Sequence, residues 1–151
     1  MRSILTLAAL VLGCTLFAQS AGHLYNKSLA DSLGADEYGM KYYTFVILKS
    51  GPNKIDNQEK LNELFRGHLD NIGRLADEGK LVVAGPFGKN DKSYRGLYIL
   101  NAPTLQDAQA LLDTDPAIKA GVFDVELYQW YGSAALPEYL KVHKQIEKSK
   151  H

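Results

Sequence analysis

Between residues 40 and 131, short apolar stretches alternate with two longer amphipathic ones. The short stretches are rich in β-branched and aromatic residues and end at glycine, proline or polar clusters, which is typical of strands. These predicted strands cover residues 41–49, 80–87, 94–101 and 122–131. Apolar residues spaced three and four apart predict helices over residues 57–78 and 104–113. The order β-α-β-β-α-β predicts a ferredoxin-like α+β fold.

Two helices cover only one face of a four-stranded sheet, so the residues on the other face are informative. In the last predicted strand, one face carries Asp124, Glu126, Tyr128 and Trp130. A face that mixes aromatic rings with a few acids suits a protein partner or a ligand cavity better than water. We therefore predict a homodimer joined through the open faces of its sheets. The alternative is a monomer whose C-terminal segment folds back over the sheet.

Both ends of the chain differ from this central domain. Residues 1–20 combine a positive start, an apolar run and a small-residue cleavage site, which predicts a signal peptide and an exported, periplasmic or secreted protein. The apolar run is too short for a stable membrane span. Lipid attachment at Cys14 is the alternative, although Leu12 is bulky for such a site. Residues 21–39 are predicted to be a loosely packed arm, and residues 132–151 a C-terminal helical extension.

Composition excludes several classes of function. The chain carries 17 Lys and Arg against 17 Asp and Glu, and this balance predicts no attraction to nucleic acid or to an anionic membrane. The one cysteine lies within residues 1–20, so a processed chain has neither a disulfide nor a thiolate ligand. Four histidines without repeated close spacing make no metal signature, and no phosphate-binding or dinucleotide motif is present. We therefore expect no metal and no cofactor.

One histidine falls on the apolar side of the first predicted helix. This side consists of Leu61, Phe65, His68, Ile72 and Leu75. An imidazole that faces the core needs a hydrogen-bond partner, because burial without one costs free energy, and Asp115 is the predicted partner. A carboxylate on one ring nitrogen fixes the tautomer and leaves the other nitrogen as a proton acceptor. Alternatively, His68 bonds a backbone carbonyl, and Asp115 only caps the turn that begins at Pro116.

Four short segments occur in a recognisable order and at recognisable separations. They are His68-Leu69, Ala84-Gly85-Pro86, Asp115-Pro116 and Ala120-Gly121-Val122-Phe123. With them, residues 40 to about 131 resemble the YCII-related (YciI-like) family. The resemblance implies a dimeric α+β barrel of two ferredoxin-like subunits and an active-site pair at His68 and Asp115. One branch of that family looks like dehydrochlorinases acting on hydroxylated aromatics. The signal peptide, the arm and the C-terminal extension depart from the family.

Two functional hypotheses follow. The first is an exported lyase or isomerase acting on a small cyclic or hydroxylated substrate, with His68 as proton acceptor and Asp115 as its orienter. The candidate substrate-binding residues are Tyr98, Tyr128 and Trp130 as pocket walls, with Arg66 and Arg95 as candidates for neutralising an anionic substrate. The alternative is a non-catalytic module of the periplasm or cell surface that binds a small molecule or a protein, in which the His-Asp pair is only structural.

Overall fold

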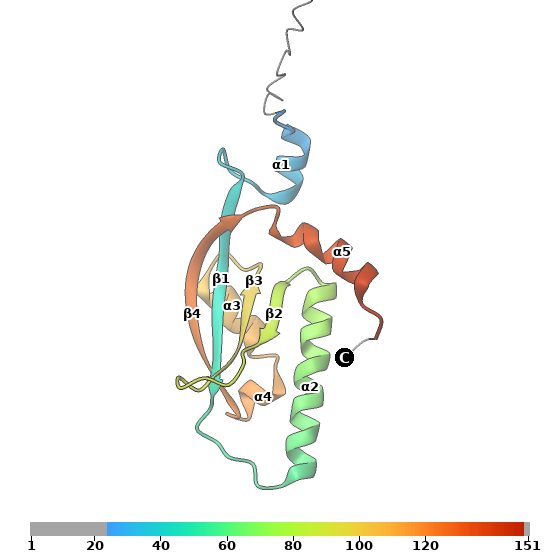
Figure 1. Cartoon of the computed structure of the whole chain (residues 1–151). Coiled ribbons are helices and arrows are strands. Elements are labelled where there is room, and N and C mark those ends of the chain that lie inside the picture. The colour runs from blue at the N-terminus through green and yellow to red at the C-terminus, as the bar shows by residue number, and fades with distance from the viewer. Residues whose placement is uncertain (1–23, 150–151) are drawn as a thin grey trace, which may run out of the picture.

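The central region forms one antiparallel sheet with helices on one of its faces. The computed structural model describes residues 24–149. Its elements are α1 (Lys27–Leu33), β1 (Met40–Ser50), α2 (Gln58–Asp77), β2 (Leu81–Pro86), β3 (Tyr94–Leu100), α3 (Leu105–Leu112), α4 (Pro116–Lys119), β4 (Phe123–Ser133), η1 (Leu136–Glu138) and α5 (Tyr139–Ile146). The strands lie in the order β2-β3-β1-β4 (Figure 1). The predicted ferredoxin-like α+β fold is confirmed.

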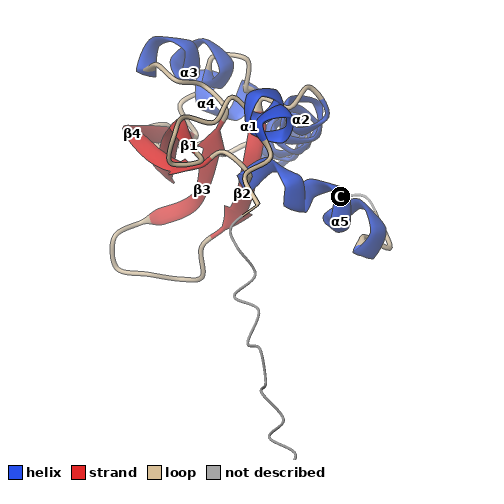
Figure 2. Ribbon diagram, turned by 90° about the horizontal axis from the view of Figure 1, so that it is seen from above, coloured by secondary structure: helices blue, strands red, loops and turns tan. Residues whose placement is uncertain are grey.

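The core lies between the sheet and the helices α2, α3 and α4, which Figure 2 shows on the same side of the strands. β1 is the central strand, since it pairs with β3 on one side and with β4 along its whole length on the other. Val46 and Leu48 of β1, Leu75 of α2 and Leu112 of α3 are buried in this layer. Burial of these side chains supplies the main free energy that holds the two layers together.

Polar residues and glycines fix where the elements begin and end. The side chains of Asn57 and Thr104 accept hydrogen bonds from backbone N–H groups in the first turns of α2 and α3. Gly51, just after β1, lies against Gly121, just before β4. A Cβ on Gly51 would lie 2.2 Å from the Gly121 carbonyl oxygen, so no other residue fits without moving backbone. This contact holds the end of β1 close to the turn that carries α4.

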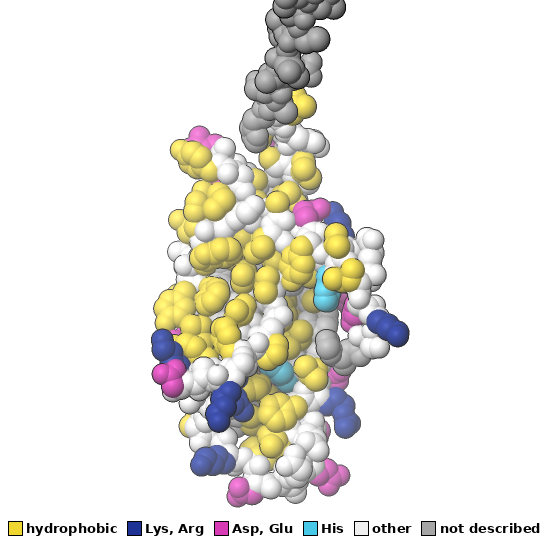
Figure 3. All heavy atoms as spheres, in the orientation of Figure 1, with side chains coloured by type: hydrophobic (Ala, Val, Ile, Leu, Met, Phe, Trp, Pro, Cys, Tyr) yellow, Lys and Arg dark blue, Asp and Glu magenta, His cyan; other side chains and the backbone are white. Residues whose placement is uncertain are grey.

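The other face of the sheet is apolar and only partly covered. Cross-strand register places on it the side chains of Phe45, Ile47, Leu97, Ile99, Tyr128 and Trp130. Tyr128 remains 52% exposed and Trp130 38% exposed. Figure 3, in the orientation of Figure 1, shows hydrophobic side chains gathered over the strands on the side turned to the viewer. This surface, which we call the open sheet face, also carries Glu126, so it matches the expected mixture of aromatic rings with a few acids.

The N-terminal arm contains a helix that the sequence pattern did not predict. α1 has no buried residue, and local capping holds it: the Asn26 side chain accepts from the backbone N–H of Leu29, and Gly34 ends the helix with φ +68°. The sequence pattern predicts no helix over Lys27–Leu33, although the lack of buried residues in α1 agrees with a loosely packed arm. The predicted signal peptide and Cys14 lie outside the described residues. Within residues 24–149, no helix has the length and apolar character needed to cross a bilayer.

The C-terminal extension is helical, as predicted, but it does not cover the open sheet face. The Tyr139 hydroxyl donates to the backbone carbonyl of Val82 and ties the start of α5 to the edge strand β2. Beyond this bond, Val142 and Ile146 of α5 remain exposed. Tyr128 remains exposed as well, so the alternative of a C-terminal segment folded back over the sheet does not describe this subunit.

Candidate functional site

The structure brings His68 of α2 and Asp115, the residue before α4, into direct contact. The His68 Nδ1 atom lies 2.6 Å from Asp115 Oδ2. The imidazole is 12% exposed and the carboxylate 1% exposed. Because a carboxylate only accepts hydrogen bonds, Nδ1–H donates to it, and His68 Nε2 is left with a free lone pair. This tautomer makes Nε2 a proton acceptor.

Asp115 has a structural task at the same time. Its second oxygen, Oδ1, accepts from the backbone N–H groups of Ala117 at 2.8 Å and Ile118 at 3.3 Å, so Asp115 is the N-cap of α4. The capping role considered from the sequence is therefore present together with the contact to His68. One oxygen holds the helix end and the other holds the ring, which leaves the carboxylate little freedom to rotate.

Tyr98 of β3 completes a chain of three polar side chains. Its hydroxyl lies 3.3 Å from His68 Nε2 and is oriented to donate to it, and the two rings are stacked with centroids 6.2 Å apart. Tyr98 is 4% exposed. Burial raises the pKa of Tyr98 far above its ordinary value, and the negative charge of Asp115 adds to the effect. Tyr98 is therefore a neutral hydrogen-bond donor at any physiological pH.

Two phenylalanines form the apolar surroundings of the imidazole. The ring of Phe123, the first residue of β4, lies 4.9 Å from the ring of His68, and Phe65 of α2 lies 5.8 Å from Phe123, all measured between centroids. The sequence placed Phe65 on the same helix face as His68. The sequence pattern gave Phe123 no role at the site. Its position shortly after the turn that Asp115 caps could have indicated that its ring lies near His68. This environment excludes water from most of the ring.

A close approach of α2 and α4 makes the His68–Asp115 contact possible. Gly67 lies against the ring of Pro116, and a Cβ at position 67 would fall 2.7 Å from Pro116 Cγ. A polar cluster supports the approach, because the Arg74 guanidinium donates to Asn71 Oδ1 at 2.8 Å and to Thr114 Oγ1 at 2.9 Å. Asn71 is buried and lies one turn after His68. No local pattern in the sequence reveals this cluster, because Thr114 lies 40 residues from Arg74 along the chain.

Replacing Gly67 with alanine should destabilise the fold and loosen the pair. Alanine gains about 1 kcal/mol in helix propensity over glycine, but the new methyl group must push Pro116 away, and such overpacking typically costs about 1–3 kcal/mol. Gly73→Ala is the matched control, since a Cβ on Gly73 meets nothing within 4 Å. We expect urea unfolding to show that Gly73→Ala stabilises the protein and Gly67→Ala does not. Equal stabilisation by both would contradict a tight contact at Pro116.

The other predicted substrate-binding residues do not converge on this pair. Tyr98 touches His68, but Tyr128 and Trp130 lie on the open sheet face, on the opposite side of the sheet from Tyr98. The predicted single pocket of these three aromatic residues is therefore wrong for one subunit. Tyr98 and Leu127 both pair with Val46 and share its face, and the residues next to Leu127 along β4 point to the other face. Arg66 is exposed on α2 and makes no contact with the pair.

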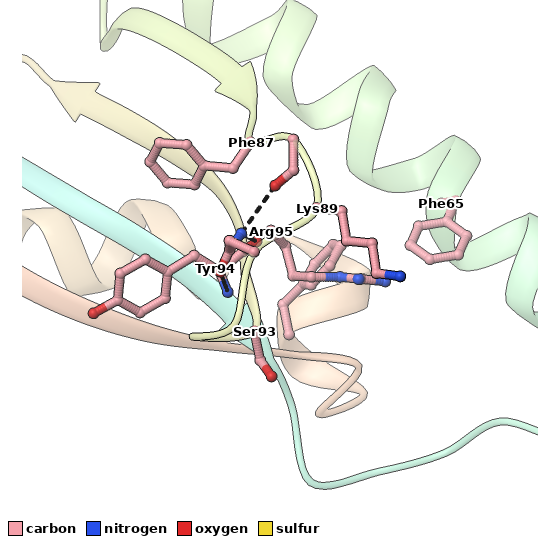
Figure 4. Close-up of a pocket in the computed structure, with 9 residues that line it drawn as sticks. Phe65, Phe87, Lys89, Ser93, Tyr94 and Arg95 are labelled. Atoms are coloured by element: carbon pink, nitrogen blue, oxygen red, sulfur yellow. Dashed lines mark hydrogen bonds between the residues drawn. The ribbon is translucent and has the colours of Figure 1, made fainter.

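A hollow of about 420 Å³ opens next to the two phenylalanines, between α2, the start of β4 and the hairpin that joins β2 to β3 (Figure 4). Its lining consists of Phe65, Phe87, Gly88, Lys89, Asn90, Ser93, Tyr94, Arg95 and Phe123. His68 is not part of the lining, and Phe123 stands between the hollow and the imidazole. Arg95 lies at this hollow, and its role in neutralising an anionic substrate stays a prediction. Within residues 24–149, no three potential ligand side chains gather as a metal site would require.

Comparisons with known proteins agree on the family. The YCII-related domain matches residues 40–131. Protein YciI of Escherichia coli O6:H1 is 35% identical over 79 residues, which cover 48% of this chain and 81% of that protein. The uncharacterized protein YjpA of Bacillus subtilis is 28% identical over 88 residues, covering 58% of this chain and 94% of its own.

One solved structure is also similar to part of the chain. It is the 5-chloro-2-hydroxyhydroquinone dehydrochlorinase TftG of Burkholderia phenoliruptrix, in complex with 2,5-dihydroxybenzoquinone. The similarity has a TM-score of 0.40 and 22% sequence identity, and it covers 58% of this chain and 92% of TftG. The domain match over residues 40–131, together with the relatives that share it, establishes that this chain belongs to the YCII-related family.

Proposed function

We propose that this protein is an enzyme of the lyase or isomerase kind, which moves a proton on a small cyclic or hydroxylated substrate. The observation that carries the proposal is the 2.6 Å contact between His68 Nδ1 and the buried carboxylate of Asp115. The carboxylate fixes the tautomer in which Nε2 accepts a proton, and it stabilises the imidazolium that forms. General base catalysis of this kind suits a carbon acid next to a carbonyl or phenol group.

Tyr98 has a part in this mechanism. Its contact with His68 Nε2 is 3.3 Å long, which is a weak hydrogen bond that a substrate proton can displace at low cost. Once displaced, the neutral hydroxyl remains next to the reacting carbon and can donate to the oxygen that gains charge when the proton leaves. His68 and Tyr98 thus act on neighbouring atoms of the substrate, while Asp115 acts only through His68.

Proton exchange tests the proposal without knowledge of the natural substrate. Cyclohexanone and hydroxybenzoquinone would be incubated with the protein in deuterated water, and loss of the ring-proton NMR signal would be followed over time. We expect exchange with at least one of the two compounds to exceed the rate in buffer with an equal amount of heat-denatured protein. Exchange at the buffer rate with both compounds would contradict the proposed proton transfer.

A second candidate function is a non-catalytic binding module. It is favoured by the fact that the protein itself satisfies all three polar groups: Asp115 caps α4 and holds His68, and the Tyr98 hydroxyl covers Nε2. No buried side-chain nitrogen or oxygen within residues 24–149 lacks a hydrogen-bond partner. In this case replacement of His68 would lower the melting temperature and leave ligand affinity unchanged.

We also propose that two subunits associate through the open sheet face to form a dimeric α+β barrel. The apolar residues on this face support the proposal, because a surface with Tyr128 and Trp130 exposed is costly in water. Ile99→Glu, at the centre of the face, should convert the dimer to a monomer in sedimentation velocity runs. Leu105→Glu is the control, since Leu105 is an exposed apolar residue on α3. A wild-type monomer, or a dimer that survives Ile99→Glu, would refute this interface.

A further inference from the structure

The hollow beside the phenylalanines is lined by two basic side chains and no acidic one. Figure 4 shows Lys89 and Arg95 reaching from the hairpin into the space in front of Phe65. Within residues 24–149, neither cation has a carboxylate within 4 Å, whereas Lys49 on the neighbouring strand is paired with both Asp124 and Glu126. Two cations that share a cavity without a counter-charge raise its positive potential. An anion is the ligand that such a cavity favours.

Asn90 fixes the backbone of the hairpin that carries Lys89 and leads into Arg95, while both cationic side chains remain exposed. The Asn90 side chain donates to the carbonyl of Gly88 at 3.0 Å and to the carbonyl of Tyr94 at 2.8 Å. Its oxygen accepts from the backbone N–H groups of Lys92 and Tyr94, both at 3.1 Å. Ser93 adopts a left-handed conformation with φ 58°. A loop whose backbone is already held by side-chain hydrogen bonds loses little conformational entropy when it binds a ligand.

The remaining walls favour a flat ring. Phe65 and Phe123 both line the hollow with ring centroids 5.8 Å apart, and Phe87 belongs to the hairpin side (Figure 4). Aromatic side chains bind planar rings by stacking and edge-to-face contacts. The planar fork of Arg95 suits the two oxygens of a carboxylate, while the Lys89 ammonium acts as a point charge. Phe123 also lies 4.9 Å from the ring of His68, between centroids, so the hollow and the proposed proton acceptor share this one wall residue.

We propose that this hollow binds a planar ring that carries a carboxylate, with Arg95 and Lys89 as the anion-binding residues and Phe65 and Phe123 as the ring-binding walls. The assignment of such a ring as the substrate rests on the proposed function of His68. The binding site itself does not, because its residues are separate from the His68–Asp115 pair. The substrate class is then an aromatic or otherwise planar cyclic carboxylate, anchored by its acid group with its ring against Phe65 and Phe123.

Benzoate and benzamide are matched probes for this site, because they differ in charge and hardly in shape. We would titrate each into the protein labelled with ¹⁵N and follow the backbone amide signals. Benzoate should shift the signals of Gly88, Asn90 and Phe123, and it should bind about tenfold more tightly than benzamide, the gain expected from one charge-assisted hydrogen bond.

Substitutions separate a specific site from general positive charge. Arg95→Gln and Lys89→Gln should each weaken benzoate binding about three- to tenfold and leave benzamide binding unchanged, and Arg95→Lys should restore part of the loss. Lys92→Gln is the matched control, because Lys92 belongs to the same hairpin and lies over the Tyr94 ring instead of lining the hollow. The amide spectrum of each variant reports whether it is folded.

Two results would overturn the anion site. One is equal affinity for benzoate and benzamide, and the other is a loss from Lys92→Gln as large as the loss from Arg95→Gln. The His68→Gln variant keeps this test apart from the proposed function, since its benzoate affinity should equal that of the wild type. Charge-dependent binding without proton exchange would support the anion site and contradict the proposed enzymatic function. Proton exchange without charge-dependent binding would support the enzymatic function and contradict the anion site.

Discussion

Replacing His68 with glutamine should reduce protein-catalysed proton exchange by about 10²–10⁴-fold, the usual contribution of a general base. Glutamine has a similar reach and retains an N–H that can donate to Asp115, but its amide has no basic nitrogen to accept the proton from substrate. The NMR exchange assay gives the rate, and circular dichroism checks that the variant is folded. The expected result is a folded protein at the buffer rate.

Two further variants show whether this loss is specific to the site. His143→Gln removes a histidine from the exposed helix α5 and should leave the exchange rate unchanged. Tyr98→Phe retains the proton acceptor and removes the hydroxyl next to it, so it should slow exchange by less than His68→Gln does. If His68→Gln exchanged protons at the wild-type rate, the imidazole would be a structural residue only.

Replacing Asp115 with alanine should lower the free energy of unfolding by about 1.5–5 kcal/mol. Loss of a side-chain N-cap typically costs about 0.5–2 kcal/mol, and leaving the His68 Nδ1–H buried without an acceptor adds about 1–3 kcal/mol. Urea unfolding followed by circular dichroism measures the sum. Asp115→Asn should lower the free energy of unfolding by less than Asp115→Ala does, because its amide oxygen can still accept from the backbone N–H groups of Ala117 and Ile118.

Asp113→Ala is the control for this result. Asp113 lies two residues earlier, is exposed, and accepts from the Gln109 side chain at 2.8 Å, so its removal should change stability by no more than about 0.5 kcal/mol. A double-mutant cycle between His68→Ala and Asp115→Ala should reveal a coupling, because the two side chains are in contact and each substitution removes that contact. Additive losses in that cycle would mean that the contact contributes nothing to folding.

Much of the fold follows from local signals in the chain. Apolar periodicity and capping residues placed the four strands and the two main helices close to their observed bounds. The inward position of His68 follows from helical spacing, and its contact with Asp115 was anticipated through the family resemblance. The signal peptide remains a prediction, because residues 1–20 lie outside the described part of the chain.

The errors have specific causes. α1 lacks an apolar stripe, so a periodicity argument overlooks it, whereas its caps at Asn26 and Gly34 were present in the sequence. The grouping of Tyr98 with Tyr128 failed because inter-strand register, which pairs Val46 with Tyr98 and Leu127, depends on the whole sheet. The hollow escaped prediction because its shape depends on the hairpin conformation that Asn90 imposes.

Asp115 both caps α4 and contacts His68, and these two roles affect what its presence in a related sequence says about activity. If the proposed proton transfer holds, a lineage that lost it would still need this aspartate to keep the end of α4 in place, so the presence of the aspartate in a sequence says little about turnover. The His68 side chain bonds to the side chains of Asp115 and Tyr98 and does not cap a helix. The histidine, and not its partner, is therefore the residue whose loss would separate inactive descendants from working ones.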